Sequence, residues 1–595
     1  MNSASTYLRT CGKYLIALLA MAGPSVTWAD IIVQGKVLDQ NGVPLTEAMV
    51  TVEPGPAKTG IAAVTVFSDA TGAFTFPAAI ANATARDLPI RAAKLGYRQV
   101  QILNHGSSGK KNTADVTIIM ENSANQAGTA PASAWLKFIP AQEDVAKLIQ
   151  NCVGCHQMPG PEVRKYAKMV HDVPSSDPAG VRLQSWAAMV KYMNFLSAEE
   201  FGRGNVNAGP IAPDRVYGVT EEDAVTKLLA QHMVGSFETL EGYDWGAPLA
   251  VNGKTVIREY AVDKPNTVRE ALLLGTPPRL WAADVSSNNV VSIDVTSGRQ
   301  KIYTVPSDIP VGPHTLVSGQ DGSLWVTPFF NGVVAHLDIE KESWRVWPLK
   351  TPDGGNIGIH DLSFDADHEL ITDKQGRIWY SDIANNAVGY FDPETGKAEI
   401  FRVPEAPGRP AQGAALYGLA MTADQKTIWF CQLGIASFGS FNIETLQFET
   451  YESLPMMDAG PRRIAMSDRD ILYLALYGAG QLIEYDTKAR RTIGIFDLPD
   501  RASAPYSVTW DNVRKVAWIP TSNANVIYRF DPADKSFQVL PLPREQGFLR
   551  MVGIDPKTGY LATSYANIAA TVHGPRMAVL IDLGDGKAGG PLSSR

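Results

Sequence analysis

The feature that most constrains the fold is a repeat in the second half of the 595-residue chain. A tryptophan or leucine within an apolar segment recurs at spacings of 43 to 54 residues. These anchors are Trp281, Trp325, Trp379, Trp429, Leu472, Trp518 and Leu561. The anchors are typically followed by a polar turn with asparagine, a strand ending in aspartate and a last strand ending in proline. Four strands per unit at this period are typical of a β-propeller, and seven anchors predict seven blades over residues 248–590.

Closure of this ring depends on a segment that precedes the first anchor. The seventh unit lacks a clear final strand, whereas residues 255–262 have the pattern of the final strands of the other units. We expect this segment to pair into the last blade, which would leave no free sheet edge in the ring.

The repeat text is clearest between Trp379 and Pro404, as W-x-x-D-x-x-x-N-x-V-x-x-[FI]-D-P-x-T-G-x-x-x-x-[FY]-x-x-P. It resembles the virginiamycin B lyase (streptogramin lyase) family. The resemblance implies a propeller and a lyase that removes a proton with His and Glu around Mg²⁺. The positions of the family's acids read Asp284, Pro328, Asp382 and Gln432 here. The missing glutamates argue against a magnesium site and against lyase chemistry.

A polar or aromatic residue also recurs ahead of most anchors. These residues are His314, His360, Tyr417, Arg462 (or its neighbour Arg463), Tyr506 and Arg550. We expect them just before the innermost strands, converging on the central funnel, where a small organic ligand would bind. The arginines favour an anionic or carbonyl-bearing ligand, and the histidines suit a base or a metal ligand. Each residue alone is more often explained by packing, but six at one position of successive units favour a binding site.

Two further features of the propeller are interpreted without chemistry. Asp365-Ala-Asp-His-Glu369 resembles a divalent-cation loop but lacks the glycine and the distal glutamate of an EF-hand, so we interpret it as a solvated turn. Cys431 lies inside an apolar stretch and is predicted to be a buried small hydrophobe.

The pentapeptide Cys152-Val-Gly-Cys155-His156 reads C-x-x-C-H, the attachment pattern of a c-type haem. Two thiols at this spacing can each add to a haem vinyl group, and the histidine is then the proximal iron ligand. A thioredoxin-like redox pair needs a βαβ context, which the sequence does not show here. A zinc site needs a second ligand pair, and the other cysteines are Cys11 and Cys431. We predict one covalent haem c.

The region around this motif, residues 136–245, has helical periodicity. Helices are expected over 143–151 and 185–196, and a third begins with a capping-box-like pair, Thr220 and Asp223. The arrangement resembles a small monohaem cytochrome c domain. We choose Met193 as the distal iron ligand, with Met189, His171 and His232 as open alternatives.

The N-terminal part carries targeting and structural signals. Residues 1–29 combine basic residues, an apolar run and a small-residue cleavage site, which predicts a signal peptide and export to the periplasm. Residues 30–122 read as short strands and turns of a β-sandwich. The order G-x-V-x-D-x-x-G-x-P-L, A-x-V, D-x-x-G-x-F-x-F and K-x-G-Y resembles the carboxypeptidase regulatory-like domain, which implies a module without chemistry. A small, polar linker is predicted over 123–135.

The expected protein is therefore multidomain and mainly β, with a sandwich, a helical cytochrome c domain and a propeller. Its net charge of −8 argues against nucleic-acid binding, and no apolar run after the signal is long enough to span a membrane. We expect an exported monohaem oxidoreductase whose propeller binds a small organic ligand and whose haem passes electrons to a cytochrome or a membrane acceptor. The alternatives are a lyase-like enzyme with an accessory haem domain, and a non-enzymatic electron-transfer or binding protein.

Overall fold

The computed structural model describes most of the chain. The described residues are 32–53, 62–77, 89–105, 113–202, 219–249, 253–262, 267–328, 331–405, 414–567 and 575–586, without the side chains of 197–202. The predicted signal peptide lies outside them. None of the described helices is long and apolar enough to cross a membrane.

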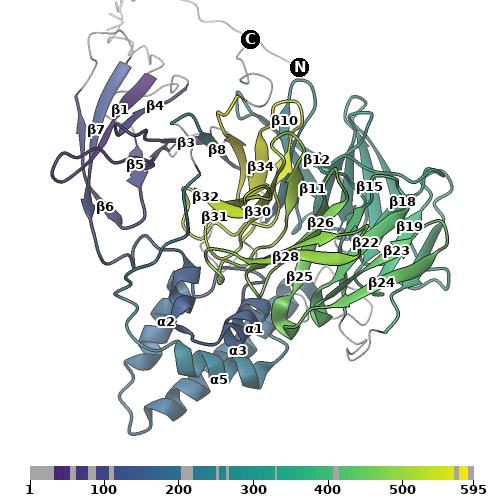
Figure 1. The fold of residues 1–595 in the computed structure, drawn as a ribbon, viewed down its shortest axis with the longest axis horizontal. Helices are drawn as coiled ribbons and strands as arrows, with labels where there is room; N and C mark the ends of the chain where they lie inside the picture. The colour runs from purple at the N-terminus through teal and green to yellow at the C-terminus, as the bar shows by residue number, and fades with distance from the viewer. Residues whose placement is uncertain are drawn as a thin grey trace, which may run out of the picture.

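The second half of the described chain forms a β-propeller of antiparallel sheets that follow one another in sequence (Figure 1). Six of these sheets have four strands each. The first three contain β9 (Val268–Leu274), β10 (Arg279–Asp284), β11 (Asn289–Asp294) and β12 (Gln300–Thr304); β13 (Pro313–Ser318), β14 (Leu324–Pro328), β15 (Val333–Asp338) and β16 (Ser343–Pro348); and β17 (Ile359–Leu362), β18 (Ile378–Asp382), β19 (Ala387–Phe391) and β20 (Ala398–Arg402). The next three contain β21 (Leu416–Met421), β22 (Thr427–Gln432), β23 (Ser437–Asn442) and β24 (Gln447–Ser453); β25 (Pro461–Met466), β26 (Ile471–Leu476), β27 (Gln481–Asp486) and β28 (Arg491–Asp497); and β29 (Thr509–Asp511), β30 (Val516–Pro520), β31 (Val526–Asp531) and β32 (Ser536–Pro541).

The first strands of neighbouring sheets contact one another from β9 through β29, so these strands are the innermost ones. The anchors lie on the second strands, and all of them except the half-buried Trp325 are buried between sheets. Trp281, Trp379 and Trp518, for example, are 0% exposed. Large aromatic side chains at these positions fill the wedge between sheets that splay outward from an axis, which explains the period of the repeat.

The ring is closed by a strand from its N-terminal end. The last sheet contains β33 (Gly553–Ile554), β34 (Leu561–Ser564) and β35 (Met577–Asp582), and β35 pairs with β8 (Val256–Ala261). The predicted pairing of residues 255–262 into the last blade is confirmed. The outer edge of β8 is paired as well, because β8 also bonds to β3 (Ala63–Phe67) of the N-terminal region.

The N-terminal region consists of two sheets around an apolar core. One contains β4 (Ala73–Thr75), β1 (Ile32–Asp39), β7 (Thr113–Asn122) and β6 (Tyr97–Asn104). The other contains β3, β2 (Met49–Val52) and β5 (Ile90–Ala93), and it continues through β8 into the propeller as one sheet of seven strands. Arg544 joins the two parts at this seam, through bonds of 2.8 Å to Glu53 and 2.9 Å to the buried Glu259.

The helices lie together at one side of the propeller (Figure 1). They are the 3₁₀ helix η1 (Ala132–Phe138) and the α-helices α1 (Gln142–Cys152), α2 (Pro161–His171), α3 (Pro178–Gly202) and α5 (Glu222–His232). Two short 3₁₀ helices, η2 (Leu433–Ile435) and η3 (Met457–Ala459), belong to propeller loops. The helix expected from 143 to 151 is thus α1, and the one expected from 185 to 196 lies within the longer α3.

The predicted capping box of the last helix does not form. Glu221 occupies the N-cap of α5 and makes no side-chain capping bond. Thr220 is held instead by the side chain of Asn151 at the end of α1, which accepts from its backbone N–H at 2.9 Å and from its hydroxyl at 3.2 Å. Tertiary contact between the two helices therefore replaces the local cap.

The helical region and the propeller share one continuous core. Leu148, Ile149 and Val153 of the helical region belong to the same buried cluster as Tyr417 and Phe548 of the propeller. Asn523 adds a polar clamp, accepting from the backbone N–H of Met158 and donating to its carbonyl, each at 2.8 Å. The helical region is thus packed into the propeller and is not a loosely tethered appendage.

Candidate functional site

A β-bulge recurs in the innermost strands near their N-terminal ends. In β9, β17, β21 and β25, two residues lie opposite one residue of the second strand. In β13, His314 is the extra residue. The bulged pairs are Arg269–Glu270, His360–Asp361, Tyr417–Gly418 and Arg462–Arg463. Side chains normally alternate between the two faces of a strand. A bulge breaks this alternation, so that two consecutive side chains can lie on the same face.

The predicted funnel residues come together, and four of the six lie at these bulges. His314, His360, Tyr417 and Arg462 lie within the innermost strands, one residue after their starts, and not before them as expected. Tyr506 and Arg550 do precede β29 and β33. The ring centroids of His314 and His360 are 4.7 Å apart, and those of His360 and Tyr417 are 3.7 Å apart. All six side chains are buried.

An ion cluster around Arg463 crosses the centre. Its guanidinium donates to Glu270 at 2.5 Å and to Asp361 at 2.6 Å, and all three side chains are 2–3% exposed. Burial alone would raise the pKa of Asp361, but Arg463 and His360 hold that pKa well below its usual range. Burial raises the pKa of Glu270 despite Arg463. Arg463 is therefore neutralised within the protein, chiefly by Asp361.

The histidines of the cluster are neutral. Burial lowers the pKa of His360 to about 4, although Asp361 opposes the shift from 3.2 Å. Burial and the charge of Arg269 lower the pKa of His314 well below its usual value. Among the described residues, no three His, Cys, Asp or Glu side chains are grouped so as to hold a metal ion.

A layer of tyrosines and arginines lies next to this cluster. The hydroxyls of Tyr417 and Tyr506 are hydrogen-bonded, and Arg269 donates to the Tyr506 hydroxyl at 3.1 Å. The guanidinium carbons of Arg462 and Arg550 lie 4.8 and 5.0 Å from the ring centre of Tyr506. Burial alone would raise the pKa of Tyr506, but the surrounding arginines lower it to about 6. Tyr506 is therefore the group in this layer that can hold or accept a proton near neutral pH.

The C-x-x-C-H pentapeptide rests directly on this layer. The Tyr477 hydroxyl donates to the carbonyl of Val153, and Arg550 donates to the carbonyl of Gly154 at 2.7 Å. The guanidinium of Arg462 stacks on the ring of Tyr477, with its carbon 3.9 Å from the ring centre. The two residues between the motif cysteines are thus hydrogen-bonded to the centre of the propeller.

The motif presents two thiols and an imidazole, the groups that a covalent haem would use. Cys152 and Cys155 carry thiols that are not joined in a disulfide. Burial raises the pKa of Cys152 to about 12, whereas reactive redox cysteines have lowered values. His156 donates from Nδ1 to the carbonyl of Gln157 at 2.7 Å, and burial lowers its pKa. Its Nε2 is left with the lone pair that a metal ligand needs.

The four candidates for a distal ligand differ in their surroundings. Met189 is half-buried against the core shared with Cys152 and Cys155, and Met193 is half-buried one turn later on α3. His171 is exposed at the end of α2. His232 is half-buried, and its Nε2 has no hydrogen-bond partner in the described part of the chain. Met193 stays a prediction, with Met189, His171 and His232 as the alternatives.

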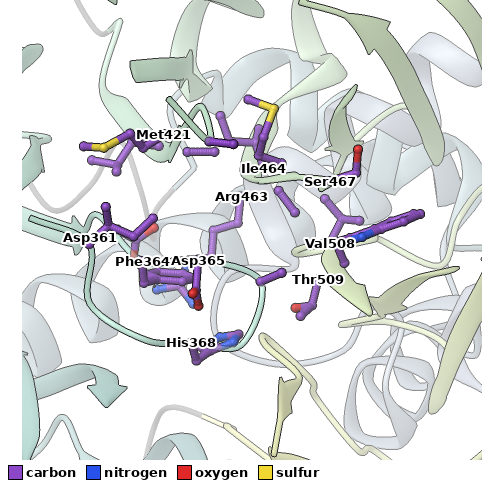
Figure 2. Close-up of a pocket in the computed structure, with 18 of the residues that line it drawn as sticks. Asp361, Phe364, Asp365, His368, Met421, Arg463, Ile464, Ser467, Val508 and Thr509 are labelled. Carbon is purple, nitrogen blue, oxygen red and sulfur yellow. Dashed lines mark hydrogen bonds and ion pairs between the residues drawn. The ribbon is translucent and has the colours of Figure 1, made fainter. Parts of the chain in front are cut away.

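A cavity of about 300 Å³ opens on the other side of the ion cluster (Figure 2). Asp361 and Arg463 form part of its wall, together with residues from the C-terminal ends of innermost strands, such as Met421 and Met466. The layer that contacts the helices comes from the opposite, N-terminal ends of these strands. The cavity and the C-x-x-C-H motif therefore lie on opposite sides of the charged centre.

The acid positions of the repeat have structural roles. Asp284 accepts from the backbone of Thr267 and the side chains of Ser286 and Ser287. Asp382 accepts from the backbone N–H of Gly358 at 2.9 Å, and burial raises its pKa to about 6. These carboxylates bind the loops between strands, so their oxygens are already used by the protein.

Comparison with protein families agrees with this architecture. The model of the virginiamycin B lyase family matches residues 249–482 and 311–565, which together span more than half of the chain. The chain belongs to the virginiamycin B lyase family. A search of curated proteins gave no match.

Solved structures of family members are similar to the chain at low identity. A streptogramin B lyase is 18% identical and covers 55% of this chain and 97% of its own, with a TM-score of 0.45. A virginiamycin B lyase from Staphylococcus aureus is 16% identical and covers 55% of this chain and 99% of its own, also with a TM-score of 0.45. A catalytically inactive variant of virginiamycin B lyase from the same organism, with quinupristin, is 15% identical, with the same coverage and TM-score.

Sequence reasoning missed several residues of the site. Arg269 lies 12 residues before the anchor Trp281, and Tyr417 lies 12 residues before the anchor Trp429. The distance from the anchor, applied to the first unit, would therefore have found Arg269. Glu270 and Asp361 are second members of bulged pairs, which strand alternation places on the wrong side. Cys431 is fully buried, as predicted.

Proposed function

We propose that the chain is an exported monohaem c-type cytochrome with oxidoreductase function, in which the propeller binds a small organic ligand. One observation carries the proposal: the carbonyls of Val153 and Gly154, inside the haem-attachment motif, are bound by Tyr477 and Arg550 at the centre of the propeller. A haem site used only for docking would not need this buried, polar contact with the ligand-binding fold.

A short series of side-chain contacts connects the cavity wall with the motif. Arg463 lines the cavity, and its neighbour Arg462 stacks on Tyr477, which bonds to the motif. Tyr506 contacts both Arg462 and Arg463, and its pKa is about 6. These residues fix the relative positions of ligand and haem motif, and Tyr506 can accept a proton that an oxidised ligand releases.

Cys152 and Cys155 would bind the haem, with His156 as the proximal ligand. Haem c supplies one-electron acceptance at this site. We infer that the seven successive sheets form seven blades and that residues 136–245 are a cytochrome c-like domain. Haem c attachment is an extracytoplasmic process in bacteria, which supports a periplasmic location and a redox partner there.

The first experiment tests the haem. The full chain, expressed with a c-type maturation system, should carry one covalent haem, measured by its pyridine haemochrome spectrum. Cys152→Ala combined with Cys155→Ala should abolish covalent attachment, whereas Cys431→Ala should not. Unchanged covalent haem in the double variant would show that the motif has been misinterpreted.

The second experiment tests electron transfer from the cavity. Oxidised protein without oxygen is mixed with panels of small organic compounds, and haem reduction is followed spectroscopically. A reducing substrate should act more slowly on Ala465→Phe, because Ala465 lines the cavity, but normally on Ala489→Phe, because Ala489 is exposed on an outer turn. Equal rates in both variants would dissociate the cavity from haem reduction.

Family membership favours a second candidate, a lyase-like enzyme with an accessory haem domain. Mg²⁺-dependent cleavage of a substrate, without a change in haem oxidation state, would support it. A protein that neither cleaves nor oxidises any compound, yet exchanges electrons with a cytochrome or a membrane acceptor, would be a carrier.

A further inference from the structure

The cavity opposite the haem motif has a wall that combines rings, thioethers and a few buried polar groups. Its apolar lining includes Phe364, Met421, Met466 and Trp510. Figure 2 shows Phe364, Asp365 and His368 on one side of it and Ser467, Val508 and Thr509 on another. Gln320, Asp365 and Asp468 on its rim are exposed, so the cavity is open to solvent. A volume of about 300 Å³ suits a ligand the size of a single substituted ring.

The buried charges of the wall are paired within the protein. Arg463 is the cation of the buried wall, and Glu270 and Asp361 neutralise it at 2.5 and 2.6 Å. Asp468 on the rim is paired with Lys515 at 2.6 Å. Binding an anion here would require Arg463 to give up a buried carboxylate, which is costly. The ligand that these charges favour is uncharged.

Three buried side chains of the wall have polar atoms without a partner among the described residues. They are both ring nitrogens of His368, the hydroxyl of Ser507 and the indole nitrogen of Trp510. These side chains are 0–2% exposed. Because buried polar groups are nearly always hydrogen-bonded, unpartnered atoms on three side chains of one cavity wall point to a polar partner at this place.

His368 has the most specific chemistry of the three. Burial lowers its pKa to about 3, so that the imidazole is neutral, with one donor and one acceptor nitrogen. Its ring stacks on Phe364, with centroids 4.7 Å apart and planes at 25°. A neutral imidazole on an aromatic face suits a ligand group that both donates and accepts, such as a hydroxyl on a ring.

The turn that carries His368 was interpreted from the sequence as solvated, and that interpretation is wrong for this residue. The backbone N–H and the hydroxyl of Ser318 both donate to the carbonyl of His368 at 2.8 Å, which draws the turn against β13. His368 has a φ of +57°, a conformation that histidine tolerates better than most residues. The backbone conformation explains a turn residue here, but it does not explain a buried imidazole.

We infer that this cavity binds an uncharged aromatic compound bearing a hydroxyl group, and that His368 is the residue that recognises the hydroxyl. The inference rests on the proposed function in taking the cavity as the ligand site, and it names the ligand class. It departs from the anionic or carbonyl-bearing ligand that the arginines suggested in the sequence, because those arginines are engaged within the protein.

The test compares three probes that share one ring: phenol, benzoate and toluene. Binding to the full-length, fully oxidised holoprotein is measured by calorimetry, so the result does not depend on haem reduction. Phenol should bind about tenfold or more tightly than benzoate and toluene. His368→Phe keeps the ring but removes both nitrogens, and it should weaken phenol about tenfold, the loss of one ligand hydrogen bond, while leaving toluene unchanged.

Controls separate recognition from folding. His368→Asn keeps a donor and an acceptor and tolerates the left-handed backbone, so it should restore most of the phenol affinity. His336→Phe, at a half-buried site on β15 outside the cavity, should change nothing. If His368→Phe does not fold, Ser507→Ala provides the test, with a several-fold weakening of phenol expected.

Three results would overturn the inference: benzoate binding as tightly as phenol, phenol affinity unchanged in the folded cavity variants, or no binding of any probe. Phenol binding without reduction of haem by any compound would support the ligand class while contradicting the proposed oxidoreductase function.

Discussion

Tyr506 gives the sharpest prediction, because its ionisation depends on groups that the fold alone assembles. An ordinary tyrosine has a pKa near 10. Arg269, Arg550 and Arg462 surround Tyr506 and outweigh its burial, and they lower its pKa to about 6. Tyr506→Phe removes the ionising hydroxyl and keeps the ring that the arginines contact.

The magnitude follows from linkage between ionisation and folding. The pKa of Tyr506 is lower in the folded state, so ionisation stabilises the fold most above pH 10, and this stabilisation is lost as the pH falls through about 6. Each pH unit between these values is worth about 1.4 kcal/mol. The free energy of unfolding of the native protein should therefore gain about 2 kcal/mol over Tyr506→Phe between pH 6 and pH 8.

Two measurements check this prediction. Urea unfolding of both proteins at pH 6 and pH 8 gives the change in their stability difference, in which other titrating groups cancel. Ultraviolet difference spectra between pH 5 and pH 8 should show one tyrosinate in the native protein and none in Tyr506→Phe. Tyr485→Phe is the control, because burial and Glu452 raise the pKa of Tyr485 to about 12.

Two outcomes would refute the reasoning about Tyr506. A stability difference that does not change between pH 6 and pH 8 would mean that Tyr506 keeps its proton. A tyrosinate signal that survives in Tyr506→Phe but disappears in Tyr417→Phe would assign the charge to the hydrogen-bonded partner Tyr417.

Three further predictions concern ion pairs and hydrogen bonds. Arg463→Met should lower the free energy of unfolding in urea by about 3–5 kcal/mol, because it leaves buried carboxylates without their cation. The control Arg490→Met breaks an exposed pair and should lower it by under about 1 kcal/mol. Equal losses would contradict the central role of the cluster. Arg544→Leu should lower the midpoint of thermal unfolding and separate the N-terminal sheets from the propeller as a distinct transition, and a single unchanged transition would argue against the seam. Tyr477→Phe should cost about 1–3 kcal/mol in urea unfolding through the lost bond to the motif, and an unchanged stability would show that the contact is weak.

The sequence predicted the features that rest on periodicity. Six of the seven anchors appear as buried residues on second strands, and residues 255–262 supply the closing strand, because a propeller repeats the same packing problem in every sheet. The convergence of six funnel residues was also predictable from spacing. The pairing of Arg463 with Glu270 and Asp361 was not, because bulges shift strand register and leave no simple signal in the residue pattern.

The cavity and the contact between the propeller and the helices could not be predicted from the sequence for a different reason. His368 lies in a turn whose sequence looks polar, and its burial depends on Ser318, 50 residues earlier. The contact between Tyr477 and Val153 joins residues 324 positions apart. Such pairings depend on the relative placement of parts, on which local patterns carry no information.

The position of β8 between β35 and β3 has a consequence for how the molecule is made. β35 is the last described strand to leave the ribosome, yet it pairs with a strand formed more than 300 residues earlier. Until β35 arrives, β8 can extend only the N-terminal sheet, and the ring stays open beside the helices. We expect the pairing of β35 with β8, and with it closure of the ring, to be the last step of folding.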